Sequence, residues 1–198
     1  MRVFGIDPGS GRTGYGCVDS DGSRHQVVTF GAIVAKPGAS FPDKLHKIHQ
    51  TLTALITTHR PDCVVIENVF HAKNARTALL LGHARGVAVL AAAEAQLPIV
   101  EYTPAAIKLA IVGYGRADKG QMQQMVKVLL GLDAIPEPHD AADALAIAIC
   151  HLHSSTSMTA RAERVAGRGA ATSVGRAAKG LTSWRDYRPG TPLRRTAP

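Results

Sequence analysis

The sequence predicts an α/β fold in which helices flank a mixed five-stranded sheet. Two observations support this prediction: three short apolar segments open the chain between turn signals, and helical patterns then alternate with short buried strands. This order of elements is typical of a layered α/β domain. The composition agrees, because 45% of the 198 residues are hydrophobic, which is enough to bury a core and excludes disorder of the whole chain.

The three opening strands are expected at residues 3–6, 13–19 and 26–35. A glycine-rich turn separates the first two, and Asp21-Gly22 marks a hairpin turn before the third. We therefore expect these strands to be antiparallel neighbours.

Capping residues and apolar spacing predict the later elements. Ser40 begins a capping box, Asn74 can cap a long helix rich in Ala and Leu, and Thr103 precedes a proline suited to the first helical position. The expected helices span residues 41–60, 74–96, a short stretch from 104, 119–130 and about 139–153, and the remaining strands span 63–67 and 98–102.

Positive charge is concentrated at the C-terminal end. Residues 154–198 hold nine Lys and Arg against two acids, net +7, whereas residues 1–153 hold fourteen against thirteen, net +1. The end region also lacks apolar periodicity, so the sequence predicts one domain over residues 1–153 and a mobile basic tail over residues 154–198.

No membrane or targeting segment is expected. No apolar run approaches the roughly 18–20 residues that cross a bilayer, and the N-terminus lacks the apolar region of a signal peptide. Three widely spaced cysteines, without metal-ligand spacing, are expected to be packing residues. The expected location is the cytoplasm.

The segment from Gly9 to Gly14 matches the GxGxxG letters of a dinucleotide-binding loop, but its context does not fit. Such a loop needs a following helix and an acid about 20 residues further on. Here the next residues run into a hairpin, and no acid lies between Asp21 and Asp43. No Lys-Ser or Lys-Thr follows the last glycine either, so a P-loop is also excluded.

Four acids are the candidate chemical groups. Asp7 and Glu67 each end a buried strand, and Asp140 and Asp143 share one face of an otherwise apolar helix. Singly, Asp7 could bond turn amides, Glu67 could be a rim residue, and the helix pair could be an N-cap and a first-turn acid.

Together, the four acids can converge at one edge of the sheet. Clustered carboxylates repel one another unless a cation neutralises them, and oxygen ligands suit Mg²⁺ or Mn²⁺. Two such ions about 3.5–4 Å apart activate water in phosphodiester cleavage. Residues 70–130 hold seven Lys and Arg against three acids, a basic surround for a polyanion. The residues alone thus predict a metal-dependent phosphoryl-transfer enzyme without fixing its substrate.

Three segments identify a family. GIDPGSGRTGYG, VVIENVFHAKNARTALLLGHARGVA and HDAADALAIAI resemble the signatures of the RuvC Holliday-junction resolvases, in order, over about residues 1–153. The resemblance implies a ribonuclease-H-like fold, a homodimer, and paired nicks in four-way DNA junctions during recombination and repair. It also implies Mg²⁺, two ions per site with Mn²⁺ as a substitute, held by the four catalytic acids Asp7, Glu67, Asp140 and Asp143.

The resemblance assigns DNA contacts as well. Phe70 would face the bases, Lys108 and Lys119 would contact the backbone near the cleaved phosphate, and Lys73 and Arg76 would add further contacts. His139 could polarise a water or contact a metal, or simply begin a helix. A RuvA/RuvB-type branch-migration complex is the implied partner. The helix from Asn74 is a candidate dimer face through Gly82 and Gly86, the alternative being packing on its own sheet.

Three other functions fit the sequence less well. A ribonuclease-H-like enzyme acting on RNA is disfavoured by the junction-specific segments around Phe70 and Lys119. Actin-like ATPases need roughly two domains of chain, which 198 residues without a repeat do not supply. A non-catalytic junction-binding protein would leave the four acids unexplained.

Overall fold

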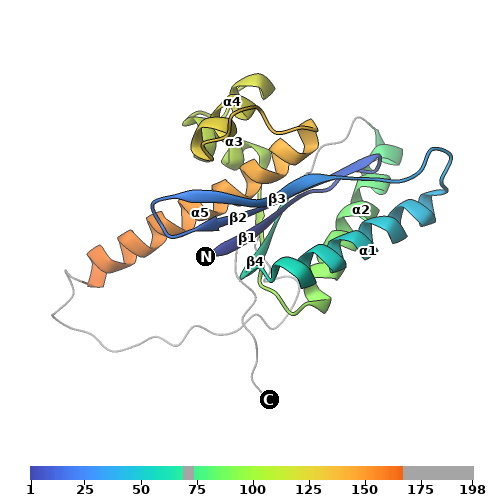
Figure 1. The fold of residues 1–198 in the computed structure, drawn as a ribbon, viewed down its shortest axis with the longest axis horizontal. Coiled ribbons are helices and arrows are strands. Elements are labelled where there is room, and N and C mark those ends of the chain that lie inside the picture. The colour runs from blue at the N-terminus through green and yellow to red at the C-terminus, as the bar shows by residue number, and fades with distance from the viewer. Residues whose placement is uncertain (69–73, 167–198) are drawn as a thin grey trace, which may run out of the picture.

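The computed structural model describes residues 1–68 and 74–166, with side chains described as far as residue 155. A five-stranded sheet forms the middle layer, with helices on both of its faces (Figure 1). The strands are β1 (Arg2–Asp7), β2 (Arg12–Ser20), β3 (His25–Val34), β4 (Cys63–Glu67) and β5 (Ile99–Tyr102). The helices are α1 (Phe41–His59), α2 (Ala75–Glu94), α3 (Pro104–Val112), α4 (Lys119–Leu129) and α5 (His139–Ala166).

The strand order is β3-β2-β1-β4-β5. The first three strands are antiparallel neighbours, and β1, β4 and β5 run parallel. The predicted mixed five-stranded sheet is therefore confirmed. The carboxyl ends of β1 and β4 meet at one edge, with Ile6 beside Ile66, so the next residues, Asp7 and Glu67, end neighbouring strands.

Side-chain alternation divides the core into two clusters. Ile6, Ile66 and other residues of the same face pack with α1 and α2, whereas Val3, Val65 and their face pack with α3, α4 and α5. The predicted caps hold: Ser40 accepts from the Asp43 amide, Asn74 from Thr77, and Thr103 from Ala106.

Helix α5 differs from its prediction. The sequence predicts an end at about residue 153, but the helix continues to Ala166, so the first part of the predicted tail is helical. The helix can continue because an already nucleated helix propagates at low cost, and the Ala, Arg and Glu of its last turns, unlike the Ser and Thr before them, have good helix propensity. Residues 167–198 lie outside the described part of the chain.

Helix α5 lies unusually close to the sheet. A Cβ atom added at Gly14 of β2 would overlap the carbonyl oxygen of Asp140, and one added at Gly5 of β1 would overlap that of Ala144. Glycine is therefore required at both positions because helix backbone occupies the space of a side chain. This close approach brings the first turn of α5 against the ends of β1 and β2.

Helix α2 is, among the described residues, the one helix long and apolar enough to span a membrane by length and composition. That test is also passed by helices of soluble cores, and Ala84, Ala88 and Ala92 are buried here. Leu79 and Leu90, by contrast, are exposed.

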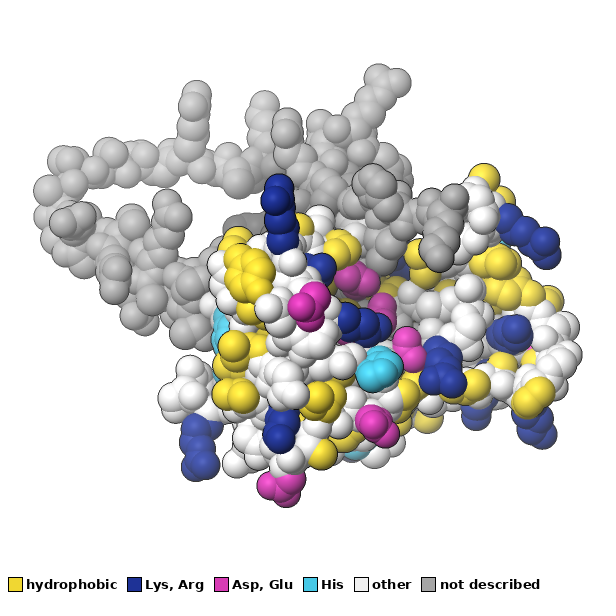
Figure 2. Space-filling view, turned by 90° about the horizontal axis from the view of Figure 1, so that it is seen from above, with side chains coloured by type: hydrophobic (Ala, Val, Ile, Leu, Met, Phe, Trp, Pro, Cys, Tyr) yellow, Lys and Arg dark blue, Asp and Glu magenta, His cyan; other side chains and the backbone are white. Residues whose placement is uncertain are grey.

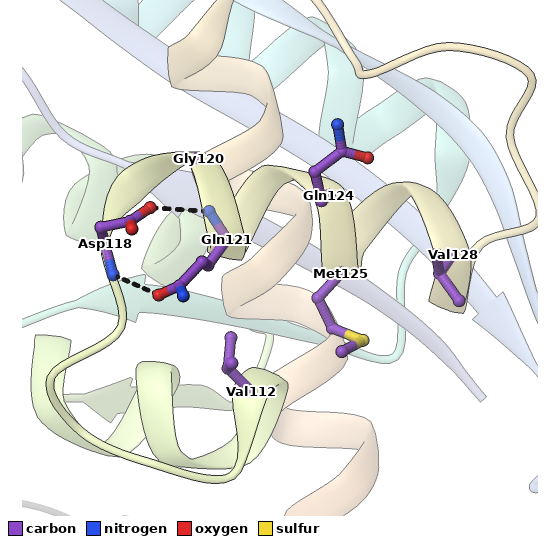
Figure 3. A pocket seen from close by; sticks show the side chains of 7 residues that line it. All are labelled: Val112, Asp118, Gly120, Gln121, Gln124, Met125 and Val128. Carbon is purple, nitrogen blue, oxygen red and sulfur yellow. Dashed lines mark hydrogen bonds between the residues drawn. The ribbon is translucent and has the colours of Figure 1, made fainter.

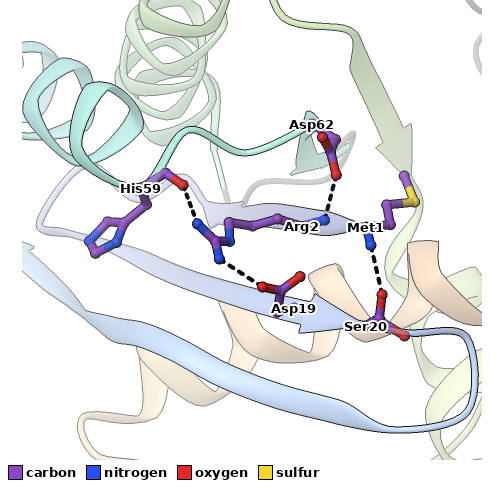
Figure 4. A network of polar contacts seen from close by, with 6 residues as sticks. All are labelled: Met1, Arg2, Asp19, Ser20, His59 and Asp62. Atoms are coloured by element: carbon purple, nitrogen blue, oxygen red, sulfur yellow. Dashed lines mark hydrogen bonds and ion pairs between the residues drawn. The ribbon is translucent and has the colours of Figure 1, made fainter.

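A network of polar contacts joins β1 to its neighbours at the end of the sheet opposite Asp7. The Arg2 guanidinium donates to Asp19 at 2.7 Å and to the His59 carbonyl at 2.8 Å, while the Arg2 amide donates to Asp62 at 2.6 Å (Figure 4). The terminal amine of Met1 donates to the Ser20 carbonyl. These contacts fasten β1 to β2 and to the end of α1, far from the edge where Asp7 lies.

Candidate active site

Asp7 and Glu67 point to the same side of the sheet. Each follows an isoleucine that packs with α1 and α2, so alternation turns both carboxyl groups towards α5. The charge of Glu67 acts on Asp7, so the two carboxyl groups lie close together.

Helix α5 brings the other two acids to this edge. Asp140 and Asp143 lie in and just after its first turn, and both charges act on Asp7. The structure thus gathers Asp7, Glu67, Asp140 and Asp143 from three elements that are distant in sequence, as the sequence predicts.

A cleft of about 230 Å³ opens at this point. Asp7, Glu67 and Asp143 line it together with Lys108 and Lys119, and its remaining walls are mostly apolar. Seen from the side of α3 and α4, Asp and Glu side chains lie among Lys and Arg side chains (Figure 2). An acidic centre with a basic rim is suited to a metal-bound polyanion.

Burial and mutual repulsion perturb the central acids. Loss of solvent, followed by the charge of Glu67, raises the pKa of Asp7 to about 8. Burial, followed by the charge of Asp143, also raises the pKa of Glu67. Both shifts mean that the ionised cluster is costly without a counter-charge.

Two cations of the chain partly supply that counter-charge. The Lys119 ammonium lies 3.0 Å from Asp143, and this contact raises the pKa of Lys119. Arg12 lies 4.0 Å from Asp140. Lys119 begins α4 directly after Asp118, whose side chain and that of Gln121 form a capping box that fixes the start of the helix.

The donor chemistry fits a hard divalent cation. The converging groups are all carboxylates, which are ligands that Mg²⁺ and Mn²⁺ prefer, and the raised pKa values of Asp7 and Glu67 show an unmet need for positive charge. Within residues 1–68 and 74–155, no three Asp, Glu, His or Cys side chains are already close enough to form a ligand set. The pairing of Asp143 with Lys119 agrees with this, because that carboxylate faces an ammonium group.

The other predicted residues are distributed as follows. Phe70 and Lys73 lie outside the described residues, and Arg76 is exposed in the first turn of α2. The Nδ1 atom of His139 is 2.8 Å from Nε2 of Gln123, a buried residue of α4. Sequence reasoning missed Arg12, because no sequence pattern indicates that the opening turn reaches Asp140.

A second cavity, of about 440 Å³, lies between α3 and α4 (Figure 3). Val112, Met125 and Val128 give it an apolar lining, and its single acid, Asp118, is engaged with the Gln121 amide. Without a carboxylate cluster it offers no metal site, so the cleft at Asp7 remains the candidate active site.

Known proteins resemble this chain over most of its length. Residues 3–151 match the family model described as crossover junction endodeoxyribonuclease RuvC. The RuvC of Alkaliphilus oremlandii is 51% identical over 154 residues, covering 78% of this chain and 94% of the relative. That of Desulforamulus reducens is 47% identical over 161 residues, covering 81% and 99%. The chain belongs to the RuvC family.

Solved structures agree with this membership. Thermus thermophilus RuvC in complex with Holliday junction substrate has a TM-score of 0.76 and 32% identity, covering 80% of this chain and 97% of that one. The yeast mitochondrial resolvase Ydc2, with a TM-score of 0.60 and 14% identity, shares the fold. The ribonuclease-H-like fold is thus confirmed.

RuvC enzymes are metal-dependent endonucleases, which confirms the predicted chemistry at the level of the family. The match to the RuvC model ends at residue 151, so the C-terminal stretch of this member extends beyond the matched region.

Proposed function

We propose that this RuvC-family chain is a Holliday-junction resolvase in which Asp7, Glu67, Asp140 and Asp143 hold Mg²⁺, two ions per site, with Mn²⁺ as a substitute. The observation that supports the proposal is the convergence of acids from β1, β4 and α5: Asp7, Glu67 and Asp143 line one basic-rimmed cleft, and the charge of Asp140 acts on Asp7. The solved complex of the T. thermophilus relative with Holliday junction supports the substrate.

The bound ions would activate the attacking water and stabilise the leaving oxygen of the cut strand. The residues of the chain have separate tasks. Asp7 and Glu67, at the ends of β1 and β4, would hold the ions as carboxylates. Asp143, which pairs with Lys119 in this structure, would help to hold the ions, and the Lys119 ammonium group would then be available to the DNA phosphate.

Lys108 and Lys119 are proposed to hold the backbone beside the cut phosphate. Both line the cleft with the acids, one from α3 and the other from the start of α4. Ammonium groups bind phosphate oxygens as point charges without reading sequence. Phe70, Lys73 and Arg76 remain proposed DNA contacts. For His139 the proposed roles are to polarise a water, to contact a metal, or simply to begin α5.

The enzyme is proposed to act as a homodimer through α2. An exposed stripe on this helix, consisting of Leu79, Gly82, Gly86, Leu90 and Ala93, is apolar and lined with small residues. Such a stripe allows two antiparallel copies of the helix to approach closely. A two-fold dimer then presents two equal sites to symmetric strands of the junction. A RuvA/RuvB-type motor is the proposed partner, and the cytoplasm the proposed location.

Cleavage of labelled substrates tests the proposal. The protein and the Glu67→Gln variant are incubated with a synthetic four-way junction, linear duplex and RNA/DNA hybrid, each with and without Mg²⁺. We expect symmetric nicks in the junction only, dependent on metal and abolished in the variant while junction binding persists. Cleavage of the hybrid instead would move the substrate to RNA, and binding without cleavage would favour a structural junction-binding protein.

A further inference from the structure

Another acid lies next to Glu67 but on the opposite face of the sheet. Glu101 of β5 pairs in register with Ile66, one residue before Glu67. Side chains of paired residues share a face, so Glu101 points with Ile66 towards α2, while Glu67 points towards α5. Glu101 is therefore at the right edge to act on Glu67 and on the wrong face to bind its metal.

Both carboxylate oxygens of Glu101 are engaged. Oε1 forms an ion pair with the Arg85 guanidinium of α2, and Oε2 accepts from Nδ2 of Asn68 at 3.1 Å. The Glu101 side chain is 13% exposed. Asn68, the residue after Glu67, is 6% exposed, and its backbone N–H donates to the Tyr102 carbonyl at 2.8 Å. Two bonds to β5 thus hold the residue that follows Glu67.

The Arg85 guanidinium, like that of Arg2, is only partly satisfied by hydrogen bonds. Its Nε atom is buried and has no hydrogen-bond partner within the part of the chain that the structure describes, and an unpaired buried donor costs free energy. A charged pair in this position nevertheless imposes a defined geometry on the groups that it joins.

We propose that Glu101 is a positioning residue, which with Arg85 fixes Asn68 and thereby the carboxyl end of β4 where Glu67 lies. Arg85 extends this control to α2. The inference rests on the proposed function, since α2 is the proposed dimer helix. The network of Glu101, Arg85 and Asn68 then fixes the position of each metal site relative to the two-fold axis of the dimer. Symmetric nicks require this fixed relation between axis and site.

Metal binding provides the primary test. Mn²⁺ is titrated calorimetrically into the full-length protein, Glu101→Gln, Arg85→Lys and Arg85→Met. Residues behind metal ligands commonly change affinity by about 10–100-fold. We expect about tenfold weaker Mn²⁺ binding in Glu101→Gln and Arg85→Met, and a smaller effect in Arg85→Lys, which keeps the charge. The rate of single-turnover cleavage should fall in the same order. Junction affinity should stay within about twofold of that of the unmodified protein, which corresponds to a change in binding free energy of about 0.4 kcal/mol.

Asp19→Asn is the matched control. It breaks a similar ion pair, that of Arg2 at the opposite end of the same sheet (Figure 4). We expect this variant to lose thermal stability comparably while keeping Mn²⁺ affinity and cleavage rate. Equal effects of Glu101→Gln and Asp19→Asn on metal affinity, or Mn²⁺ binding by Glu101→Gln as tight as in the unmodified protein, would overturn the proposal.

Glu67→Gln separates this inference from the proposed function. If the unmodified protein binds Mn²⁺ but does not cut junctions, the proposed function fails, while the ranking of Mn²⁺ affinities still decides the role of Glu101. If Glu67→Gln binds Mn²⁺ normally, Glu67 is not a ligand and the positioning role of Glu101 falls with it.

Discussion

At the scale of single residues, Asp7 has the largest conflict between burial and charge in the candidate site. Its carboxyl group lies at the end of a central strand, beside three other acids, and its pKa is raised to about 8. The sequence predicts the position of Asp7 from the strand pattern. It also predicts that the clustered acids repel one another, but not the size of the pKa shift, because that size depends on how deeply Asp7 is buried and how closely the other acids approach.

The pH dependence of metal-free stability follows from Asp7. The folded state keeps the proton up to about pH 8, whereas the unfolded chain releases it near pH 4. Because the folded state binds more protons in this interval, the free energy of unfolding falls as pH rises from 4 to 8 and levels off above. We expect Asp7→Asn to flatten much of this decline and to be the more stable protein at pH 8.

Urea unfolding in EDTA at several pH values measures this effect. Part of the decline should remain in Asp7→Asn, because Glu67 is shifted in the same direction. Adding Mg²⁺ should stabilise the unmodified protein more at pH 8 than at pH 5. Parallel curves for the two proteins would show that Asp7 does not retain its proton.

Lys119 gives a second prediction at this scale. Its ammonium group pairs with Asp143 and competes for that carboxylate with any metal ion. We expect Lys119→Met to bind Mn²⁺ roughly threefold to fivefold more tightly at pH 8.5, matching an exposed ion pair of up to about 1 kcal/mol, yet to cleave more slowly because the methionine cannot bind the DNA phosphate. Calorimetry and single-turnover cleavage test the two parts, with Lys127→Met on the same helix as control. Weaker Mn²⁺ binding would contradict the competition.

At the scale of elements, the sequence predicted what local rules determine. Strand patterns, turn residues and caps placed the ten elements close to their observed bounds, with α5 as the exception. The convergence of Asp7 and Glu67 followed from two strands ending at one edge. Residues joined only by tertiary packing were missed: the Lys119 contact with Asp143, and Glu101, whose face depends on the register of β5 against β4.

Gly14 also has a structural role that the sequence analysis did not predict. Of the glycines that match the letters of a dinucleotide-binding loop, Gly14 serves instead to admit α5, since the backbone of Asp140 occupies the space beside it. We expect Gly14→Ala to push the first turn of α5 from the sheet, to lower the free energy of unfolding by at least about 1–3 kcal/mol, and to abolish cleavage.

Gly11→Ala is the control, because no atom lies within 4 Å of a Cβ added there. Its stability should stay within about 0.5 kcal/mol of the unmodified protein. Chemical denaturation and junction cleavage measure both variants. Full activity in Gly14→Ala would show that the helix can withdraw without disturbing Asp140 and Asp143.

At the scale of the whole molecule, charge is divided between the catalytic domain and the C-terminal stretch. Residues 167–198 hold seven Lys and Arg against Asp186 alone, net +6. We expect deletion of these residues to weaken binding to duplex DNA and to make that binding less dependent on salt. The magnitude of the slope of log affinity against log salt concentration should fall by about 0.9 for each phosphate that the stretch neutralises.

Deletion of residues 167–198 should not change the cut position, and a moved cut site would contradict a purely electrostatic role. Salt titrations and mapping of nicks test this.

The proposed homodimer is the other property of the whole molecule, and α2 carries its proposed interface. Leu90 is 50% exposed on the stripe with Gly86, and Leu109 of α3 is 58% exposed on the opposite side of the sheet. We expect Leu90→Glu to yield a monomer, because two copies would bring buried carboxylates together across the two-fold axis. Leu109→Glu, which adds the same charge at similar exposure, should remain dimeric.

Sedimentation velocity distinguishes the monomer from the dimer. Cleavage of a supercoiled plasmid that carries a four-way junction reports whether the two nicks are made together. A dimeric Leu90→Glu variant would place the interface elsewhere. A monomer that still nicked both strands together would show that pairing of the cuts does not depend on two sites held in one rigid enzyme.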